Sequence, residues 1–250
     1  MSPPPLFDSS AVHAPSRVAS WLALALSAGA VNAIALAACS RYVTHVTGTL
    51  TRIGIDALSW PLVFEYLLVL GAFVLGAASS VGLSEGRRLR GLPPRPWAPL
   101  ALTASLLALA GALGSLGVFG DFGAGVERPG DFAFLAVLAF GMGLQNAAVA
   151  TATGMLVRTT HMTGPATDLG VALGTLAHDV PSPLREAARR SAALRGGKMI
   201  AFAIGAGLGI ALAGTLGYAA LVVPAVVIAG VAATTFALTL PADALRLERA

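Results

Sequence analysis

Residues 45–54 are HVTGTLTRIG and residues 161–170 are HMTGPATDLG, so a short polar stretch occurs twice in this chain. Each copy follows a strongly apolar segment that holds a glycine and an asparagine. These are Gly29 and Asn32 before the first copy, and Gly143 and Asn146 before the second. The recurrence indicates an internal repeat. Polar groups are costly in lipid and persist where something needs them, so function is to be sought around the two copies.

The composition predicts an integral membrane protein. The 250 residues are 56% hydrophobic and 11% charged, with a mean hydropathy of +0.79, which is more apolar surface than one water-soluble core can hide. About 20 apolar residues cross the hydrocarbon layer as a helix. Runs of that length predict six spans, at 18–39, 62–83, 98–119, 132–157, 199–220 and 221–240. These runs lack the period-two alternation of barrel strands, so the predicted fold class is all-α.

The expected organisation is one transmembrane domain with two tails. Residues 1–17 contain four prolines and are expected to form a disordered tail. Residues 18–240 form the domain, with repeat A at 18–119 and repeat B at 132–240, and residues 241–250 form a C-terminal tail. A tight turn near Val223-Pro224 is expected to separate the last two spans.

Charges in the connections predict the orientation, because arginine and lysine stay preferentially in the cytoplasm. The connections 84–97 and 158–198 are rich in arginine, and placing both inside also places both termini inside. Only Arg41, Arg52 and Arg128 then remain outside. The formal charge of +4 is explained by loops that face anionic lipid headgroups, so no nucleic-acid partner is implied.

The same assignment gives the two repeats opposite orientations. Repeat A starts in the cytoplasm and repeat B starts outside, because three crossings separate the two starting points. Inverted repeats recur in secondary transporters, where the substrate site lies at the interface of the repeats, and they also occur in channels.

The chain also resembles a known family. The resemblance rests on a Gly-x-x-Asn near the end of an apolar run, followed by a His-x-Thr-Gly segment, and it extends over residues 19–240. These residues are similar to the YoaK-type family of small polytopic bacterial membrane proteins, which has no known function. Family members commonly carry Asn after the first Thr-Gly, whereas this chain has Thr49 there and Pro165 in the second copy. The resemblance implies about six helices in a bacterial plasma membrane, and no activity.

Each Thr-Gly copy is predicted to start a short helix, over residues 48–58 and 164–177. Threonine is a good N-cap and proline suits the first turn. Neither helix is long enough to span the bilayer. Two arrangements remain open: interfacial helices, with Arg52 paired to Asp56, or half-helices that dip to the middle of the membrane. In the second arrangement the helix N-termini attract an anionic group.

Aligning the two copies places Arg52 opposite Asp168. If both helices dip inward, these residues are expected to meet as a buried ion pair, which is how charges inside a membrane are usually accommodated. Asp168 is then a candidate proton carrier, because separation from the arginine changes its protonation.

The predicted substrate-binding residues are Asn32, Thr47, Gly48, Arg52, Asn146, Thr163, Gly164 and Asp168, with His45, His161 and Gln145 as further contributors. Interhelical hydrogen bonding, worth about 1 kcal/mol each, is the alternative role for the asparagines. Two histidines without nearby carboxylates or cysteines make a weak metal site, so hydrogen bonding at the helix start is the alternative for them. Neither metal nor cofactor is expected.

The predicted function is a secondary transporter or exporter of a small solute. The sequence contains no nucleotide-binding loop and no convincing enzyme constellation, so ATP-driven pumping and catalysis are not expected of this chain. A lipid-modifying enzyme with His45 or His161 as base, and a non-transporting scaffold or sensor, are the alternatives. The expected partners are the lipid bilayer and an unidentified small molecule, and homo-oligomerisation is compatible with the sequence.

Overall fold

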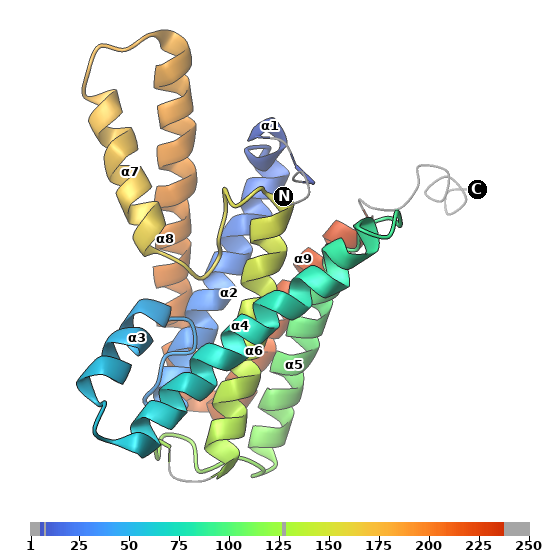
Figure 1. Ribbon diagram of the computed structural model, residues 1–250, viewed down its shortest axis with the longest axis vertical. Coiled ribbons are helices and arrows are strands. Elements are labelled where there is room, and N and C mark those ends of the chain that lie inside the picture. The colour runs from blue at the N-terminus through green and yellow to red at the C-terminus, as the bar shows by residue number, and fades with distance from the viewer. Residues whose placement is uncertain (1–5, 8, 127–128, 238–250) are drawn as a thin grey trace.

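All the regular structure in the described part of the chain is helical, as predicted. The computed structural model describes residues 6, 7, 9–126 and 129–237 (Figure 1). The helices are α1 (Ser9–Val12), α2 (Pro15–Cys39), α3 (Val46–Ile55), α4 (Trp60–Arg88), α5 (Trp97–Ser115), α6 (Pro129–Ala152), α7 (Thr163–Leu176), α8 (Ser182–Leu216), the 3₁₀ helix η1 (Gly217–Leu221) and α9 (Val222–Ala237).

Five helical stretches are long and apolar enough to cross a membrane. They are α2, α4, α5, α6 and the continuous stretch Ser182–Ala237. That last stretch contains α8, η1 and α9, and it reverses direction at η1 (Figure 1). The reversal therefore lies earlier than the expected turn at Val223-Pro224. Gly217 there has φ 54°, a conformation that glycine adopts without strain, whereas Pro224 sits in the first turn of α9, where proline fits a helix.

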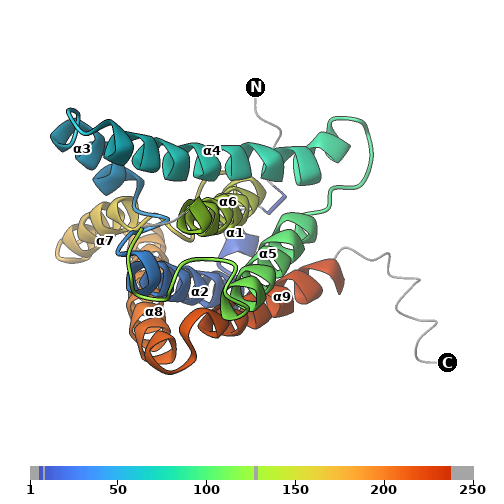
Figure 2. The same ribbon diagram turned by 90° about the horizontal axis from the view of Figure 1, so that it is seen from below.

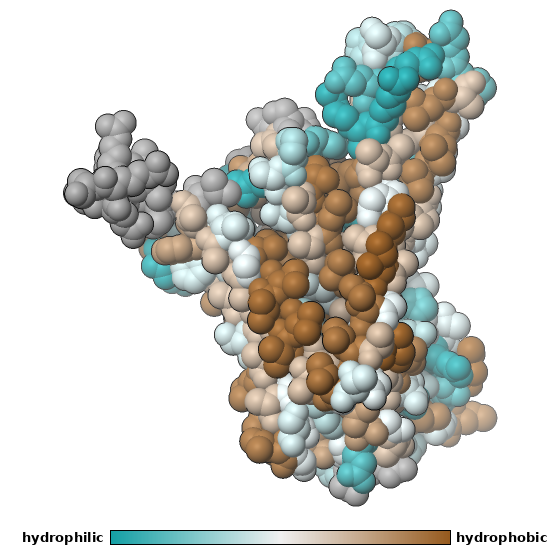
Figure 3. All heavy atoms as spheres, turned by 180° about the vertical axis from the view of Figure 1, so that it is seen from behind, coloured by the Kyte–Doolittle hydropathy of each residue, from teal (hydrophilic) through white to brown (hydrophobic). Residues whose placement is uncertain are grey.

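The outer surface matches a lipid environment. Large aliphatic side chains are exposed on several long helices, including Leu75 on α4, Leu109 on α5 and Val226 on α9, each more than half exposed. Figure 3 shows apolar surface over the middle of the molecule and polar surface at the tip that α7 and α8 form. Because lipid is as apolar as these side chains, their exposure is what a membrane-spanning surface requires.

Four helices form two tightly packed pairs (Figure 2). Helix α2 packs chiefly against α8 and α6 packs chiefly against α4, while α5 and α9 pack on each other and close one side. A Cβ atom on Gly29 of α2 would overlap the carbonyl oxygen of Phe202 on α8, and a Cβ on Gly143 of α6 would overlap that of Phe73 on α4. Each pair is therefore in backbone contact through glycine, as small residues allow between membrane helices.

The same joints contain a reciprocal contact. A Cβ on Gly205 of α8 would overlap the carbonyl oxygen of Leu26 on α2, and a Cβ on Gly76 of α4 would overlap that of Phe140 on α6. In both pairs, a glycine on each helix is thus in close contact with the backbone of the other helix. Gly76 and Gly205 are therefore positions where a small residue is required for the helices to pack.

The short helices α3 and α7 diverge from the middle of the molecule. In Figure 1, α7 runs from the middle to the upper end and α3 runs from the middle toward the lower end. Helix α7 lies along α8, where Leu169 approaches Gly196. The two copies of the Thr-Gly segment therefore start close to each other and point to opposite ends.

The described part of the N-terminal tail differs from the expectation for residues 1–17. It contains α1, and Val12 is fully buried and accepts a hydrogen bond from the Trp21 indole at 3.2 Å. The Phe7 backbone N–H also bonds to the carbonyl of Ala152 at 3.0 Å. Apolar residues between the prolines thus dock this stretch on α2 and α6. The expected C-terminal tail, 241–250, lies outside the described residues.

Candidate functional site

Two asparagines hold the irregular segments that precede α3 and α7. The Asn32 side-chain oxygen accepts hydrogen bonds from the backbone N–H groups of Val43 at 3.1 Å and Thr44 at 3.2 Å. In the second copy, the Asn146 oxygen accepts from the N–H of Thr160 at 3.2 Å. Each bond satisfies backbone that no helix can pair, and so each asparagine folds the chain back alongside the helix that carries it.

Gln145 has a structural place beside this arrangement. It is fully buried, and its amide nitrogen donates to the Leu24 carbonyl at 3.1 Å and to the Thr159 hydroxyl at 3.0 Å. It thereby ties α6 to α2 and to the segment before α7. It does not line the cavity described below.

The starts of the two short helices differ from the predicted threonine caps. Helix α3 begins at Val46 and α7 at Thr163, and neither has a side-chain cap. The threonines lie inside the first turn, because the cap positions are occupied by His45 and Met162. A Cβ on Gly48 would lie 2.6 Å from His45 Nδ1, and a Cβ on Gly164 would lie 2.9 Å from His161 Cε1. In each copy the glycine leaves room for the imidazole that precedes it by three residues.

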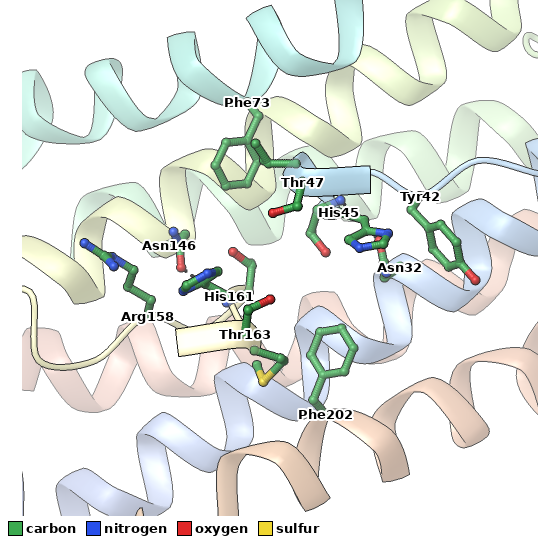
Figure 4. Close-up of a pocket in the computed structure, with 14 residues that line it drawn as sticks. Asn32, Tyr42, His45, Thr47, Phe73, Asn146, Arg158, His161, Thr163 and Phe202 are labelled. Carbon is green, nitrogen blue, oxygen red and sulfur yellow. Dashed lines mark hydrogen bonds between the residues drawn. The ribbon is translucent and has the colours of Figure 1, made fainter. Parts of the chain in front are cut away.

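Both helix starts open on one central cavity of about 470 Å³ (Figure 4). His45 and Thr47 enter it from one side and His161 and Thr163 from the other. The complete lining is Asn32, Tyr42, Thr44, His45, Val46, Thr47, Phe73, Asn146, Arg158, Thr160, His161, Met162, Thr163 and Phe202. Residues from six separate segments therefore meet in this one space.

The cavity lies at the level of the middle of the long helices. Phe202 contacts Gly29 near the midpoint of α2, and Phe73 contacts Gly143 just past the midpoint of α6. Because both phenylalanines line the cavity, the starts of α3 and α7 lie at this level too.

The cavity contains one charged side chain and two free amide donors. Arg158 is the one Lys, Arg, Asp or Glu among the described residues that line it. The asparagine oxygens are used by backbone N–H groups, which leaves the Asn32 and Asn146 amide nitrogens without partners in the described structure. Burial and then the charges of Arg158 and Lys198 lower the pKa of His161 from its ordinary value.

A further cavity adjoins the central one on each side. The α3-side cavity, about 500 Å³, shares Tyr42 and His45 with the central cavity. The α7-side cavity, about 60 Å³, shares Arg158 and His161 with the central cavity. Aligning the two Thr-Gly copies makes the two side cavities equivalent in position, yet they differ about eightfold in volume.

An ion pair lies at each side cavity. Arg41 pairs with the buried Glu65 at the α3-side cavity, with a second contact of 3.3 Å between Arg41 Nη2 and Glu65 Oε2. At the α7-side cavity, Arg195 Nε lies 2.9 Å from Asp168 Oδ2. Both pairs connect a segment around a Thr-Gly copy to the long helix that follows it.

The expected pair between Arg52 and Asp168 is wrong. Arg52 lines the α3-side cavity, whereas Asp168 lines the α7-side cavity and binds Arg195. The two helices diverge from their N-termini, and both charges sit one turn beyond that meeting point. The alternative pair of Arg52 with Asp56 is not formed either, because the Asp56 carboxylate accepts from the Tyr66 hydroxyl at 3.0 Å.

The structure divides the predicted site residues into three groups. Six line the central cavity: Asn32, Thr47, Asn146, Thr163, His45 and His161. Four line the side cavities: Gly48, Arg52, Gly164 and Asp168. Gln145 lines none of these three cavities. No group of three or more His, Cys, Asp or Glu side chains suited to a metal occurs in the described part of the chain.

Sequence reasoning missed several lining residues. Arg158 precedes His161 by three residues just as Tyr42 precedes His45, so the equivalent spacing was a usable signal. Phe73 and Phe202 each precede a joint glycine by three residues, Gly76 and Gly205. Their place in the site depends on the packing of α4 on α6 and of α8 on α2.

Long apolar helices around an internal polar cavity define a polytopic helical membrane protein. A family model described as "Protein of unknown function (DUF1275)" matches residues 20–234, and the chain belongs to that family. The match confirms the resemblance to the YoaK-type family. No curated protein and no solved structure matches the chain.

Proposed function

We propose that this protein is a secondary transporter or exporter of a small solute in a bacterial plasma membrane, working without ATP. Its site is the central cavity, at the interface of two inverted halves. The observation that carries the proposal is that the two Thr-Gly copies, on helices pointing to opposite ends, converge on one cavity. Transporter sites are commonly built in this way, from broken helices at the midplane between inverted repeats.

The reciprocal glycine contacts support the inverted halves. In the proposed arrangement, α2, α3, α4 and α5 correspond in order to α6, α7, α8 and α9. The joint of Gly29 with Phe202 then corresponds to that of Gly143 with Phe73. Equal spacing along both helices is expected if one unit occurs twice. With the reversal at η1, the chain crosses the membrane six times, and both termini face the cytoplasm.

The level of the cavity supports re-entrant helices over interfacial ones. In this proposal α3 returns to the outer surface and α7 to the inner surface, and each starts at mid-depth. Irregular backbone at that depth is tolerated where it lines a cavity and is buried in protein, as the segments held by Asn32 and Asn146 are.

The unequal side cavities support alternating access. With arginine-rich connections inside, the α3-side cavity of about 500 Å³ faces outward and the α7-side cavity of about 60 Å³ faces inward. The structure then corresponds to an outward-facing conformation. A conformation in which the α7-side cavity is large and the α3-side cavity is small would present the central cavity to the cytoplasm.

Thiol labelling tests this proposal without knowledge of the solute. Cys39 is the only cysteine in the sequence and is fully buried, so the native chain should give little background labelling. Single substitutions Thr47→Cys and Thr163→Cys place a thiol on each wall of the cavity. We expect a membrane-impermeant maleimide to label both from the outside in right-side-out vesicles, and both from the cytoplasmic side in inside-out vesicles.

Matched positions control the orientation and the permeation of the reagent. Leu58→Cys, on a fully exposed residue beyond α3, should react from the outside alone, and Glu186→Cys, on the exposed start of α8, from the inside alone. Val74→Cys, on the apolar face of α4, should stay unlabelled from both sides. Labelling of the cavity positions from one side only would instead favour the non-transporting scaffold or sensor.

A further inference from the structure

We propose that the central cavity binds a small organic monoanion, with a carboxylate as its charged group. This inference rests on the proposed function in that it names the solute class of the same site. It goes beyond it in assigning the charge, the donors that meet the charge, and the surfaces that hold the rest of the molecule.

The charge of the lining favours one negative charge on the ligand. Arg158 contributes one permanent positive charge, and no carboxylate is among the described lining residues. Lys198 and Arg195 lie next to it at the α7-side cavity, and there Asp168 binds Arg195. The site therefore has an excess of positive charge, which a membrane interior tolerates poorly unless an anion balances it.

The two helix starts add partial positive charge in the same place. Helices α3 and α7 have 10 and 14 residues, and their first-turn N–H groups have no side-chain cap. Uncapped helix N-termini bind anions through the helix dipole and through these N–H groups. Two of them meeting on one cavity makes a cation the least suitable occupant.

An independent observation comes from Asn32. Its side chain is 8% exposed and lines the cavity, while its oxygen is already bonded to two backbone N–H groups. The amide nitrogen is thus left as a donor facing the cavity, without a partner in the described structure. A ligand that displaces water from this donor must supply an acceptor, and a carboxylate oxygen does so.

The remaining walls suit an organic body rather than a bare inorganic ion. Phe73 and Phe202 come from α4 and α8 on opposite sides of the cavity (Figure 4). Volumes of about 300–1,000 Å³ with apolar walls and a few convergent polar groups are typical of small-molecule sites. At about 470 Å³ this cavity accommodates a small carboxylate with an apolar end.

Acid and amide pairs of matched shape test the proposal on the full-length protein in nanodiscs. The probes are butyrate against butyramide and benzoate against benzamide, at constant ionic strength. Thermal unfolding is followed by the fluorescence of the native tryptophans, since a ligand of the folded state raises the midpoint. We expect at least one acid, and neither amide, to raise it. Equal shifts from an acid and its amide, or no shift from either acid, would overturn the proposal.

Two variants assign the effect to this cavity. Arg158→Gln should weaken acid binding about tenfold or more, because it removes a charge-assisted hydrogen bond. Arg190→Gln, at an exposed arginine paired with Glu186 away from the cavity, should bind normally. Asn32→Asp keeps the oxygen that Val43 and Thr44 need while replacing the free donor by an acceptor, and should abolish binding at pH 8 with the fold retained. Unchanged acid binding in Arg158→Gln and Asn32→Asp would overturn the assignment.

The outcomes separate this inference from the transport proposal. Cavity cysteines labelled from both sides, without acid-specific stabilisation, would leave transport standing and overturn the anion. Acid-specific stabilisation lost in Arg158→Gln, together with labelling from one side only, would leave an anion site in a protein that does not transport.

Discussion

At the scale of single residues, the most telling contact is the imidazole that lies over a glycine at the start of each short helix. His45 covers Gly48 and His161 covers Gly164. A histidine held in this way presents its ring to the cavity without a hydrogen-bonded cap on the helix. The first turn of each helix thus lacks the side-chain cap that a threonine would have supplied.

Replacing that glycine should therefore displace the ring. Gly48→Ala puts a Cβ atom 2.6 Å from His45 Nδ1, and we expect it to lower stability by about 1–3 kcal/mol, as overpacking does. The midpoint of thermal unfolding in detergent measures the effect. The double variant His45→Ala with Gly48→Ala should recover most of the loss.

Gly54→Ala is the matched control, because Gly54 lies in the same helix and a Cβ there meets nothing within 4 Å. It should be neutral or stabilising by up to about 1 kcal/mol, from helix propensity alone. Equal destabilisation by both substitutions would contradict the role assigned to His45.

At the scale of elements, the two long-helix joints depend on backbone contact. Rigid carbonyl groups, not flexible side chains, face Gly205 and Gly76. A methyl group at either position must push two helices apart along their length. The two positions should therefore respond alike, although they lie far apart in the chain.

We expect Gly205→Ala and Gly76→Ala each to lower the free energy of unfolding by about 2 kcal/mol or more, or to prevent assembly, since the packed backbone cannot yield. Gly207→Ala on α8 and Gly71→Ala on α4 are the controls, because a Cβ at either site meets nothing within 4 Å. The monodisperse yield and the thermal midpoint of the four variants check this. Similar values for all four variants would contradict the claim that backbone contact at Gly205 and Gly76 stabilises the protein.

Apolar length predicted the helical class and the rough extent of the long helices, but not their ends. Helix α8 begins at Ser182, well before the apolar run at 199, because a helix satisfies its own backbone and can continue beyond the lipid. The repeat pointed to the asparagines, threonines and histidines of the cavity. It could not reveal Phe73 or Phe202, which join the site only through helix packing.

At the scale of the whole molecule, the two side cavities differ about eightfold in volume, although one ion pair lies at each of them. The smaller one is bordered by the pair of Asp168 and Arg195, whose side chains are 53% and 17% exposed. Partly exposed pairs contribute roughly 0.2–1 kcal/mol, which is enough to bias a two-state equilibrium but not to lock it.

Asp168→Asn should accordingly favour opening on the α7 side. We expect labelling of Thr163→Cys from the cytoplasmic side to become a few-fold faster, up to about fivefold for 1 kcal/mol. Glu186→Gln, which breaks an exposed pair with Arg190 on the same helix, should leave the rate unchanged. A slower rate in Asp168→Asn, or an equal gain in both variants, would contradict this role.

The glycine joints also have a mechanical consequence. They bring the backbones of α2 and α8, and those of α6 and α4, into direct contact, so we expect each pair to move as one body. The cavity lies between the two pairs. Asn32 and Phe202 line it from the α2–α8 pair, and Asn146 and Phe73 line it from the α6–α4 pair. Gln145 of α6 donates to the Leu24 carbonyl of α2, so any proposed rocking of one pair against the other would have to break or stretch this hydrogen bond.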